Sequence, residues 1–370
     1  MVTTGTLTFH AAHNYGSMLQ AYALQRFLLG LGFANEIVDL RLPSQREMYE
    51  PFRVLPAKSA ANFLQHLLDL RFKPALDRKY RRFEQFLSDD LQKTAEFGSG
   101  EELERAVPPF DYFIAGSDQI WNLTAGDFDW SYFLPFAQGN ALAYAPSLGP
   151  GGQRVRKEAN WDRVRDCLSH FKAVSVREQG SAALLEKMTG IRAEVLVDPT
   201  MLLTRGEWDA CLASRPSVRP GYILVYSPAV YTREMLRTVR ETARRTGKRV
   251  VITNPVDGRL RFATLGFEKA YDCGPWEFLQ LVRSADLVMT TSFHAVVFSL
   301  LFERPFFAYR DYGDNRIDHF LSLTGMEDRL IRTDARELVA DPFAVDFGAV
   351  PAILERERAR SRDYLLQNLR

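Results

Sequence analysis

Two short polar segments, each following an apolar run, carry the side chains best suited to chemistry. In one, Ser292 and His294 follow the run DLVM at 286–289; in the other, Arg177 follows VSV at 174–176. Arginine suits bidentate binding of phosphate or carboxylate, and a histidine can transfer protons near neutral pH. An arginine and a histidine at strand ends therefore predict a site for a small, doubly anionic substrate.

The local pattern around His294 also predicts a helix start. Ser292 is a typical N-cap, and the apolar residues Ala295–Phe302 continue as a helix. Free N–H groups at that helix start attract anions. Two alternatives stay open, because Arg177 could simply pair with Glu178 or another acid, and a single histidine is often a surface or hydrogen-bonded structural residue.

Two further segments carry polar groups directly after expected strands. The block 113–122 (FIAGSDQIWN) combines Asp118 with Trp121, as sugar sites combine carboxylates with an aromatic face, although a helix cap and a core anchor are the alternatives. The loop 10–17 has a single glycine and lacks a dinucleotide fingerprint. There Gly16 and Ser17 either contact a substrate hydroxyl or phosphate, or form a turn that caps a helix at Met18–Leu29.

The elements that must position these segments alternate between strand and helix in two series. We predict two Rossmann-like, doubly wound α/β domains facing a cleft, at 1–215 (acceptor side) and 221–345 (donor side). The stretch 216–221 (PSVRPG) is the expected linker, and 346–370 is expected to be a C-terminal helix. Ligands of such sheets sit beyond the strand carboxyl ends, so both marked segments should open toward the cleft.

Composition excludes several classes of function. The 370 residues contain 47 Lys plus Arg and 46 Asp plus Glu, a net charge of +1 that argues against a nucleic-acid binder. No run approaches the roughly 20 apolar residues of a membrane span, and no signal peptide is apparent. Three scattered cysteines predict neither disulfides nor a zinc site, which favours a cytoplasmic protein without a metal. The basic stretch Arg71–Arg82 fits either anionic lipid headgroups or a solvated helix face.

Six segments together resemble the polysaccharide pyruvyl transferase family. They are NYGSMLQAYALQ at 14–25, GSDQIWN at 116–122, YAPSLG at 144–149, SVRE at 175–178, DPTMLL at 198–203 and TSFHA at 291–295. Pro146 departs from the small residue that is more usual at its position. The resemblance implies a fold like that of the two-domain GT-B glycosyltransferases, phosphoenolpyruvate as donor, a sugar diol as acceptor, and no additional cofactor.

The resemblance also implies roles for particular residues. It places Arg177 and His294 at the donor, with Arg316 as a weaker candidate, and Asp118 is a plausible base that orients an acceptor hydroxyl. The other residues expected to contact substrate are Asn14, Tyr15, Gly16, Ser17, Gly116, Ser117, Trp121, Asn122, Ser147, Ser292 and Phe293. A lipid-linked acceptor would bring the enzyme to the inner face of the plasma membrane.

Two alternative functions fit the same architecture. A sugar-nucleotide glycosyltransferase of GT-B type would also bind anions in its second domain, and Glu277 or Asp286 could hold a ribose. A non-catalytic binding protein is less well supported, because it would not need both Arg177 and His294.

Overall fold

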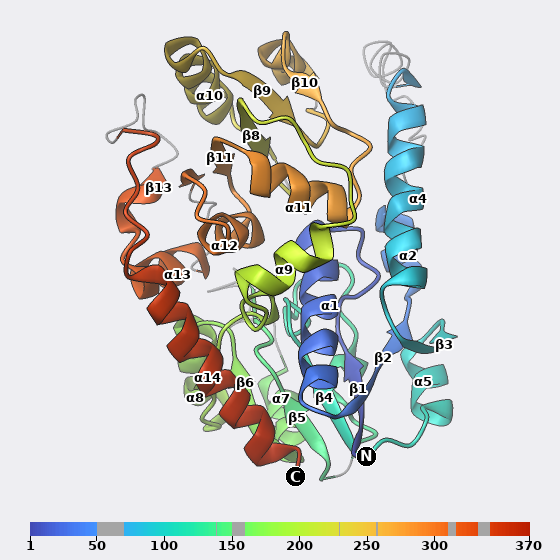
Figure 1. The fold of residues 1–370 in the computed structure, drawn as a ribbon. Coiled ribbons are helices and arrows are strands. Elements are labelled where there is room, and N and C mark those ends of the chain that lie inside the picture. The colour runs from blue at the N-terminus through green and yellow to red at the C-terminus, as the bar shows by residue number, and fades with distance from the viewer. Residues whose placement is uncertain are drawn as a thin grey trace.

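The computed structural model is built on two parallel β-sheets flanked by helices (Figure 1). It describes residues 1–49, 70–137, 139–149, 160–228, 230–256, 258–309, 316–331 and 341–370. The expected two-sheet α/β fold is confirmed, and the predicted linker 216–221 is the coil that joins the two series of strands.

The first sheet has the strand order β3-β2-β1-β4-β5-β6-β7, and the sheet with its helices is called the first unit here. Its strands are β1 (Thr3–Leu7), β2 (Ala34–Leu40), β3 (Lys93–Phe97), β4 (Tyr112–Ala115), β5 (Ala141–Ala143), β6 (Phe171–Val176) and β7 (Glu194–Val195). The second sheet, in the second unit, has the order β10-β9-β8-β11-β12-β13. Its strands are β8 (Tyr222–Tyr226), β9 (Arg249–Ile252), β10 (Glu268–Lys269), β11 (Leu287–Thr290), β12 (Phe306–Tyr309) and β13 (Leu330–Ile331).

Helices cover both sheets and connect the two units. The α-helices are α1 (Tyr15–Gly30), α2 (Pro43–Tyr49), α4 (Lys73–Asp89), α5 (Gly100–Ala106), α7 (Trp161–Leu168), α8 (Gln179–Thr189), α9 (Arg205–Leu212), α10 (Arg233–Thr246), α11 (Pro275–Ser284), α12 (Phe293–Leu301), α13 (Arg316–Thr324) and α14 (Val350–Asn368). Short 3-10 turns are η1 (Trp130–Phe133), η2 (Pro199–Met201), η3 (Gly258–Thr264) and η4 (Glu327–Arg329).

The sequence located most elements, with corrections at two helix starts. The expected helix at Met18–Leu29 begins earlier, at Tyr15, because Asn14 accepts a hydrogen bond from Gly16 N and caps α1. The residues 59–92 carry two helical patterns in the sequence, split by Pro74, and the part up to residue 69 lies outside the described residues. Pro74 itself sits in the first turn of α4, where its missing N–H has no cost.

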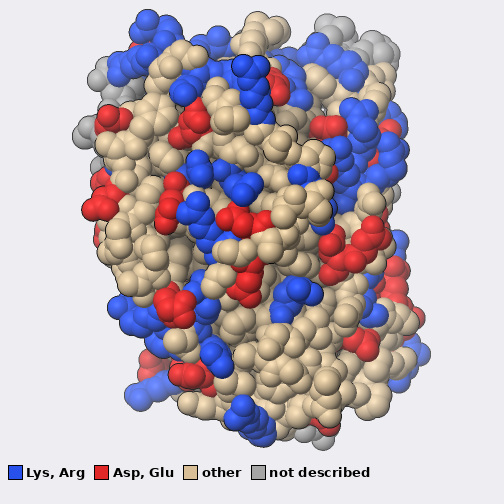
Figure 2. Space-filling model, viewed as in Figure 1, with Lys and Arg blue, Asp and Glu red and all other residues tan. Residues whose placement is uncertain are grey.

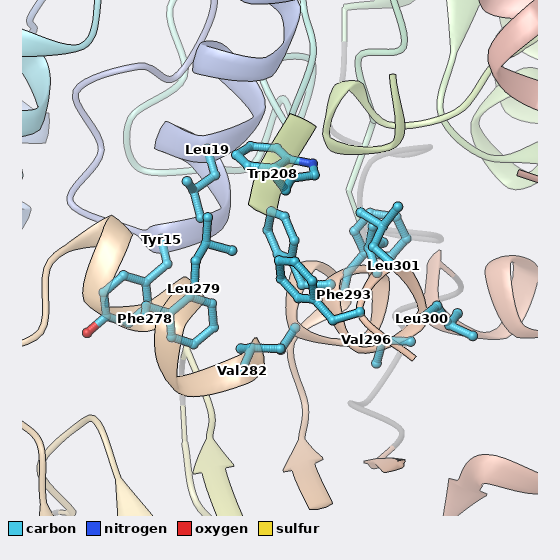
Figure 3. Packing of buried hydrophobic residues seen from close by; sticks show 14 of the residues in the cluster. Tyr15, Leu19, Trp208, Phe278, Leu279, Val282, Phe293, Val296, Leu300 and Leu301 are labelled. Atoms are coloured by element: carbon cyan, nitrogen blue, oxygen red, sulfur yellow. The ribbon is translucent and has the colours of Figure 1, made fainter. Parts of the chain in front are cut away.

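One hydrophobic core spans the boundary between the two units (Figure 3). The Tyr15 ring from α1 stacks on Phe278 from α11, with centroids 4.3 Å apart and planes 1° apart. Leu19 of the first unit lies in the same cluster as Leu279 and Val296 of the second. Because this contact is buried and apolar, the units are held in a fixed relation.

The C-terminal helix α14 returns from the second unit along the first unit, and both chain ends lie at the same end of the molecule (Figure 1). Tyr364 donates a hydrogen bond to Ala143 O at 2.8 Å, and Leu365 and Leu369 are fully buried in a cluster of the first unit. The chain therefore crosses between the units a second time.

Candidate functional site

The strand order reverses once in each sheet, between β1 and β4 in the first and between β8 and β11 in the second. At such a switch point, adjacent loops diverge and leave a crevice beyond the strand carboxyl ends. The loops there are the starts of α1 and the 116–122 segment in the first sheet. In the second sheet they are the turn after β8 and the 291–294 segment. Three of the segments marked in the sequence, 10–17, 113–122 and 291–295, therefore meet at one place.

A cavity of about 340 Å³ lies between these loops, with walls from both units. Among the residues expected at the site, those that line it are Asn14, Ser17, Asp118, Asn122, Ser292, Phe293, His294 and Arg316. The structure thus brings the predicted histidine to the same cavity as Asp118.

His294 is fixed from two sides at the bottom of this cavity. Its Nε2 lies 3.3 Å from Asp198 Oδ2, and the Asp198 side chain is fully buried. On its other edge the ring packs on Gly16, where a Cβ would lie only 2.0 Å from His294 Nδ1. The predicted cap is confirmed as well, since Ser292 Oγ accepts from Ala295 N at 3.3 Å. The first unit therefore supplies the surface against which a second-unit imidazole is positioned.

Arg177 is balanced by acids and does not lie open to a ligand in this cavity. Its guanidinium, 2% exposed, lies 3.0 Å from Asp198 and 3.6 Å from Asp118, and it donates to Ser117 Oγ at 3.0 Å. Burial alone would raise the pKa of Asp198, but Arg177 and His294 outweigh it and hold that pKa well below its usual range. The alternative in which Arg177 pairs with an acid is therefore confirmed, with Asp118 and Asp198 rather than Glu178 as the partners.

The first-unit wall presents carboxylates and amides. Asp118 adopts a left-handed backbone conformation with φ of 67° and accepts a hydrogen bond from the Ser17 hydroxyl. A second carboxylate, Asp127, lines the same wall. Burial raises the pKa of Asp127, and the charge of Asp118 raises it further, against the opposing effect of its own backbone N–H. A wall of this kind accepts hydrogen bonds from hydroxyl groups.

Arg316 and Phe293 separate this cavity from a second one of about 360 Å³, because both line the two cavities. When the Gln119 side-chain amide is oriented with its oxygen toward Arg316, that oxygen accepts hydrogen bonds from Arg316 Nη1 at 2.7 Å and from Arg316 Nη2 at 3.1 Å. Arg177 borders the second cavity, and its Nε and Nη1 have no hydrogen-bond partner among the described residues. The guanidinium carbons of Arg177 and Arg316 lie 5.3 Å and 6.0 Å from the centroid of the Phe293 ring.

Two aromatic residues expected at the site are core residues instead. Trp121 is fully buried, donates its indole N–H to Tyr132 O at 3.0 Å and stacks on Phe133. Tyr15 is 1% exposed and belongs to the core between the units. Neither ring offers a face to a sugar, because each packs inside a hydrophobic core. The sequence pattern could not distinguish a buried aromatic ring from one that lines a binding surface.

Three smaller residues of the predicted set shape the loops without lining the cavity. Gly116 has φ of 127°, and a Cβ there would lie 2.1 Å from Tyr144 O, so only glycine fits. Ser117 donates to Ala145 O, and Ser147 donates to Glu178 Oε1 at 2.9 Å. These hydroxyls hold neighbouring strand ends together.

The sequence did not point to Asp198, Asp127, Gln119 or Tyr49 as site residues, although all four lie at one of the two cavities. Asp198 begins the segment DPTMLL at 198–203, which the family resemblance includes. Its position shortly after a strand could have identified it as a site residue. Asp127 and Tyr49 follow no periodic pattern that would have singled them out.

The family model for "Polysaccharide pyruvyl transferase" matches residues 14–311 of the chain. The chain belongs to the polysaccharide pyruvyl transferase family. It is accordingly a transferase, and the matched range includes both carboxylates of the first-unit wall as well as His294.

Solved structures of other enzymes share the fold of this pyruvyl transferase family member. UDP-GlcNAc 2-epimerase from Neisseria meningitidis, bound to UDP-GlcNAc, is 10% identical with a TM-score of 0.54, over 100% of this chain and 99% of that one. The Methanocaldococcus jannaschii enzyme, in complex with UDP-GlcNAc and UDP, is 13% identical with a TM-score of 0.52, over 100% and 99%. No curated protein matches the chain in sequence. The likeness establishes a GT-B-like fold.

No described helix has the length and apolar character needed to span a bilayer. Within the same residues, no group of three or more His, Cys, Asp or Glu side chains is arranged to hold a metal ion.

Proposed function

We propose that this family member transfers the pyruvyl unit of phosphoenolpyruvate to two hydroxyls of a saccharide, forming a cyclic pyruvate ketal and releasing phosphate. The acceptor would belong to a surface polysaccharide or its lipid-linked precursor, made on the cytoplasmic side of the envelope. The observation that carries the proposal is the division of one cavity into a cationic wall and a carboxylate-rich wall.

The cationic wall supports the donor assignment. It consists of Arg316, His294 and the N-terminus of α12, whose first N–H groups point out of the helix. Phosphoenolpyruvate carries two anionic groups, a phosphate and a carboxylate. The Arg316 guanidinium and the N-terminus of α12 can each bind one of them. We assign Arg177 a positioning role here, because its charge in this cavity is already balanced by Asp118 and Asp198.

The opposite wall supports the acceptor assignment. Asp118, Asp127, Asn14 and Asn122 present oxygen acceptors and amide donors, the groups that bind sugar hydroxyls. Asp127, with its raised pKa, is suited to take a proton from a hydroxyl and release it. The sugar would then lie between the first-unit wall and the donor.

In the proposed reaction, His294, whose Nε2 lies 3.3 Å from Asp198 Oδ2, gives a proton to the methylene carbon of the donor, and the carbon that bears the phosphate becomes cationic. The first hydroxyl oxygen bonds to that carbon and its proton goes to Asp118 or Asp127. The C–O bond to phosphate breaks, the second hydroxyl adds to the resulting cation, and its proton leaves with the phosphate.

The test is phosphate release from phosphoenolpyruvate in the presence of oligosaccharide acceptors, compared between the wild type and His294→Ala. We expect a loss of at least about 10²-fold, the usual contribution of a general acid. His170→Ala, which changes an exposed histidine of the first unit, should keep wild-type turnover. Wild-type turnover in His294→Ala would remove this residue from the mechanism.

A thermal-shift comparison separates this proposal from the sugar-nucleotide glycosyltransferase alternative. A ligand that binds only the folded state stabilises it by RT ln(1 + [L]/Kd) and so raises the melting temperature. Stabilisation by phosphoenolpyruvate but not by UDP-, GDP- or CMP-sugars is the expected result. The reverse pattern would favour the glycosyltransferase.

A further inference from the structure

We propose that a patch at the far end of the second unit docks the protein on a membrane that contains anionic phospholipids. The patch consists of Arg71, Phe262, Leu265 and Lys269, and is called the η3 patch below. All four residues line one cavity of about 430 Å³, distant in the chain from the residues of the site described above. The inference goes beyond the proposed reaction and does not depend on it.

The apolar part of the η3 patch is unusually exposed for a folded protein. Phe262 is 64% exposed and Leu265 is 65% exposed, although each is a large hydrophobic side chain. They lie three residues apart, at the end of η3 and just beyond it. Exposed apolar side chains that adjoin one another mark surfaces that meet another apolar phase.

The η3 patch contains two cations, Arg71 and Lys269. Within the described part of the chain, neither Arg71 nor Lys269 forms an ion pair with a carboxylate, and Lys269 donates instead to Phe267 O at 2.9 Å and to Thr264 O at 3.2 Å. Burial lowers the pKa of Lys269, and the nearby positive charge of Arg71 lowers it further. A phosphate placed between these two cations would relieve their repulsion.

The loop that carries Leu265 is held in place. Arg240 of α10 donates to Ala263 O at 2.7 Å and to Leu265 O at 3.2 Å. The same guanidinium lies 5.4 Å from the centroid of Phe267, which is buried. The exposed side chains are therefore presented to solvent by a tethered backbone.

The basic helix α4 is a weaker candidate for this contact than the sequence suggested. Arg78 and Arg82 pair with Asp272, and Arg82 also lies 3.5 Å from Glu277, so these charges join α4 to the second unit. Lys73 pairs with Asp77 within the helix. Only Arg71, just before the start of α4, contributes to the η3 patch.

The surroundings of the η3 patch favour a bilayer as its occupant. Figure 2 shows Lys and Arg gathered at the upper edge of the molecule, over α10 and the upper part of α4. An apolar centre with a basic rim matches the boundary between acyl chains and anionic headgroups. This charge complementarity selects an anionic membrane over an uncharged protein partner.

The experiment is co-sedimentation of the full chain with vesicles of phosphatidylcholine alone or with about 30% phosphatidylglycerol, the latter mimicking an anionic leaflet. We expect binding only to the anionic vesicles, weakened by added salt. The double variant Phe262→Ser, Leu265→Ser should bind about tenfold more weakly. Arg71→Gln should bind about fivefold more weakly, since it removes one of the attracting charges.

Matched controls change the same residue types elsewhere. Phe343→Ser alters another exposed aromatic residue, 39% exposed, and Arg192→Gln alters an arginine whose side chain is 88% exposed. Both should bind like the wild type. Equal binding by all variants, or no binding of the wild type to anionic vesicles, would overturn the proposal. Light scattering gives a second test. If the double variant lost self-association while its vesicle binding stayed unchanged, the proposal would also fail, because the patch would then contact a second copy of the chain.

Discussion

At the scale of single residues, the site depends on how His294 is held. Asp198 faces Nε2 of the imidazole, and Gly16 packs against the opposite edge of the ring. Neither neighbour belongs to the second unit, which carries the histidine in α12. A change of one methyl group on the first unit should therefore move the imidazole.

We predict that Gly16→Ala lowers turnover about a hundredfold while the protein remains folded. The added Cβ would lie 2.0 Å from His294 Nδ1, so the ring must shift, and a displacement of about 1 Å at a reacting group can cost that much. Steady-state phosphate release and circular dichroism measure the two quantities.

Gly30→Ala is the matched control, because it changes the last glycine of the same helix where no heavy atom lies within 4 Å. It should keep wild-type turnover. Normal turnover in Gly16→Ala would show that the imidazole position is not critical.

A second prediction concerns Asp198, whose folded-state pKa is lowered. Asp198→Asn leaves Arg177 buried with less compensating charge, so the free energy of unfolding at pH 7 should fall by about 3–5 kcal/mol. A carboxylate with a lowered folded-state pKa stabilises the fold above its unfolded pKa and loses that contribution as pH falls. The difference between wild type and variant should therefore shrink below about pH 4.

Urea unfolding at several pH values measures this difference. Asp166→Asn, at an exposed position of α7, should show almost no difference at any pH. A stability difference for Asp198→Asn that stays constant between neutral and acidic pH would contradict the electrostatic explanation.

At the scale of elements, α14 shows how a polar-looking helix can be essential to packing. Its many charges face solvent or pair with each other, as Arg358 does with Glu355. Leu365 is nevertheless fully buried in a hydrophobic cluster of the first unit. Arg358 also donates to Met201 O and Leu202 O at 3.0 Å, beyond the end of the first sheet.

We predict that Leu365→Ala lowers the free energy of unfolding by about 2–5 kcal/mol, because it leaves a cavity in a packed cluster. Denaturant titration measures the change. Arg362→Ala, at an exposed position of the same helix, should change stability by less than about 0.5 kcal/mol. Equal effects of the two substitutions would mean that α14 is not docked as described.

At the scale of the whole molecule, the two units share one core and should behave as one cooperative body. The stacked pair Tyr15 and Phe278 crosses the boundary, and Trp208 packs edge-on against Phe298 of α12. A cleft above such an interface is largely pre-formed, so any closure of the units on substrate is limited to small movements.

We predict a single calorimetric unfolding transition, with equal calorimetric and van't Hoff enthalpies. The shared core requires this, because neither unit can unfold without exposing apolar surface of the other. Two well-separated transitions in a differential scanning calorimetry trace would contradict it and would indicate independent domains.

The sequence by itself determined the two α/β series, the strand before Thr291, the Ser292 cap and the position of His294 at a helix start. These features are local: a cap needs a partner three residues away, and strand and helix periods repeat within ten residues. The family resemblance followed from the same short segments.

Only the tertiary structure decided which of the marked residues face the cavity. It placed Asp198 beside His294, balanced Arg177 with two carboxylates and buried Trp121 in the core. The residues that make the charged contacts are 21 to 96 positions apart in the sequence, and charge pairing between such segments leaves no periodic trace in the chain. The sequence therefore supplied the chemical groups, while packing of the two units set which of them can meet a substrate.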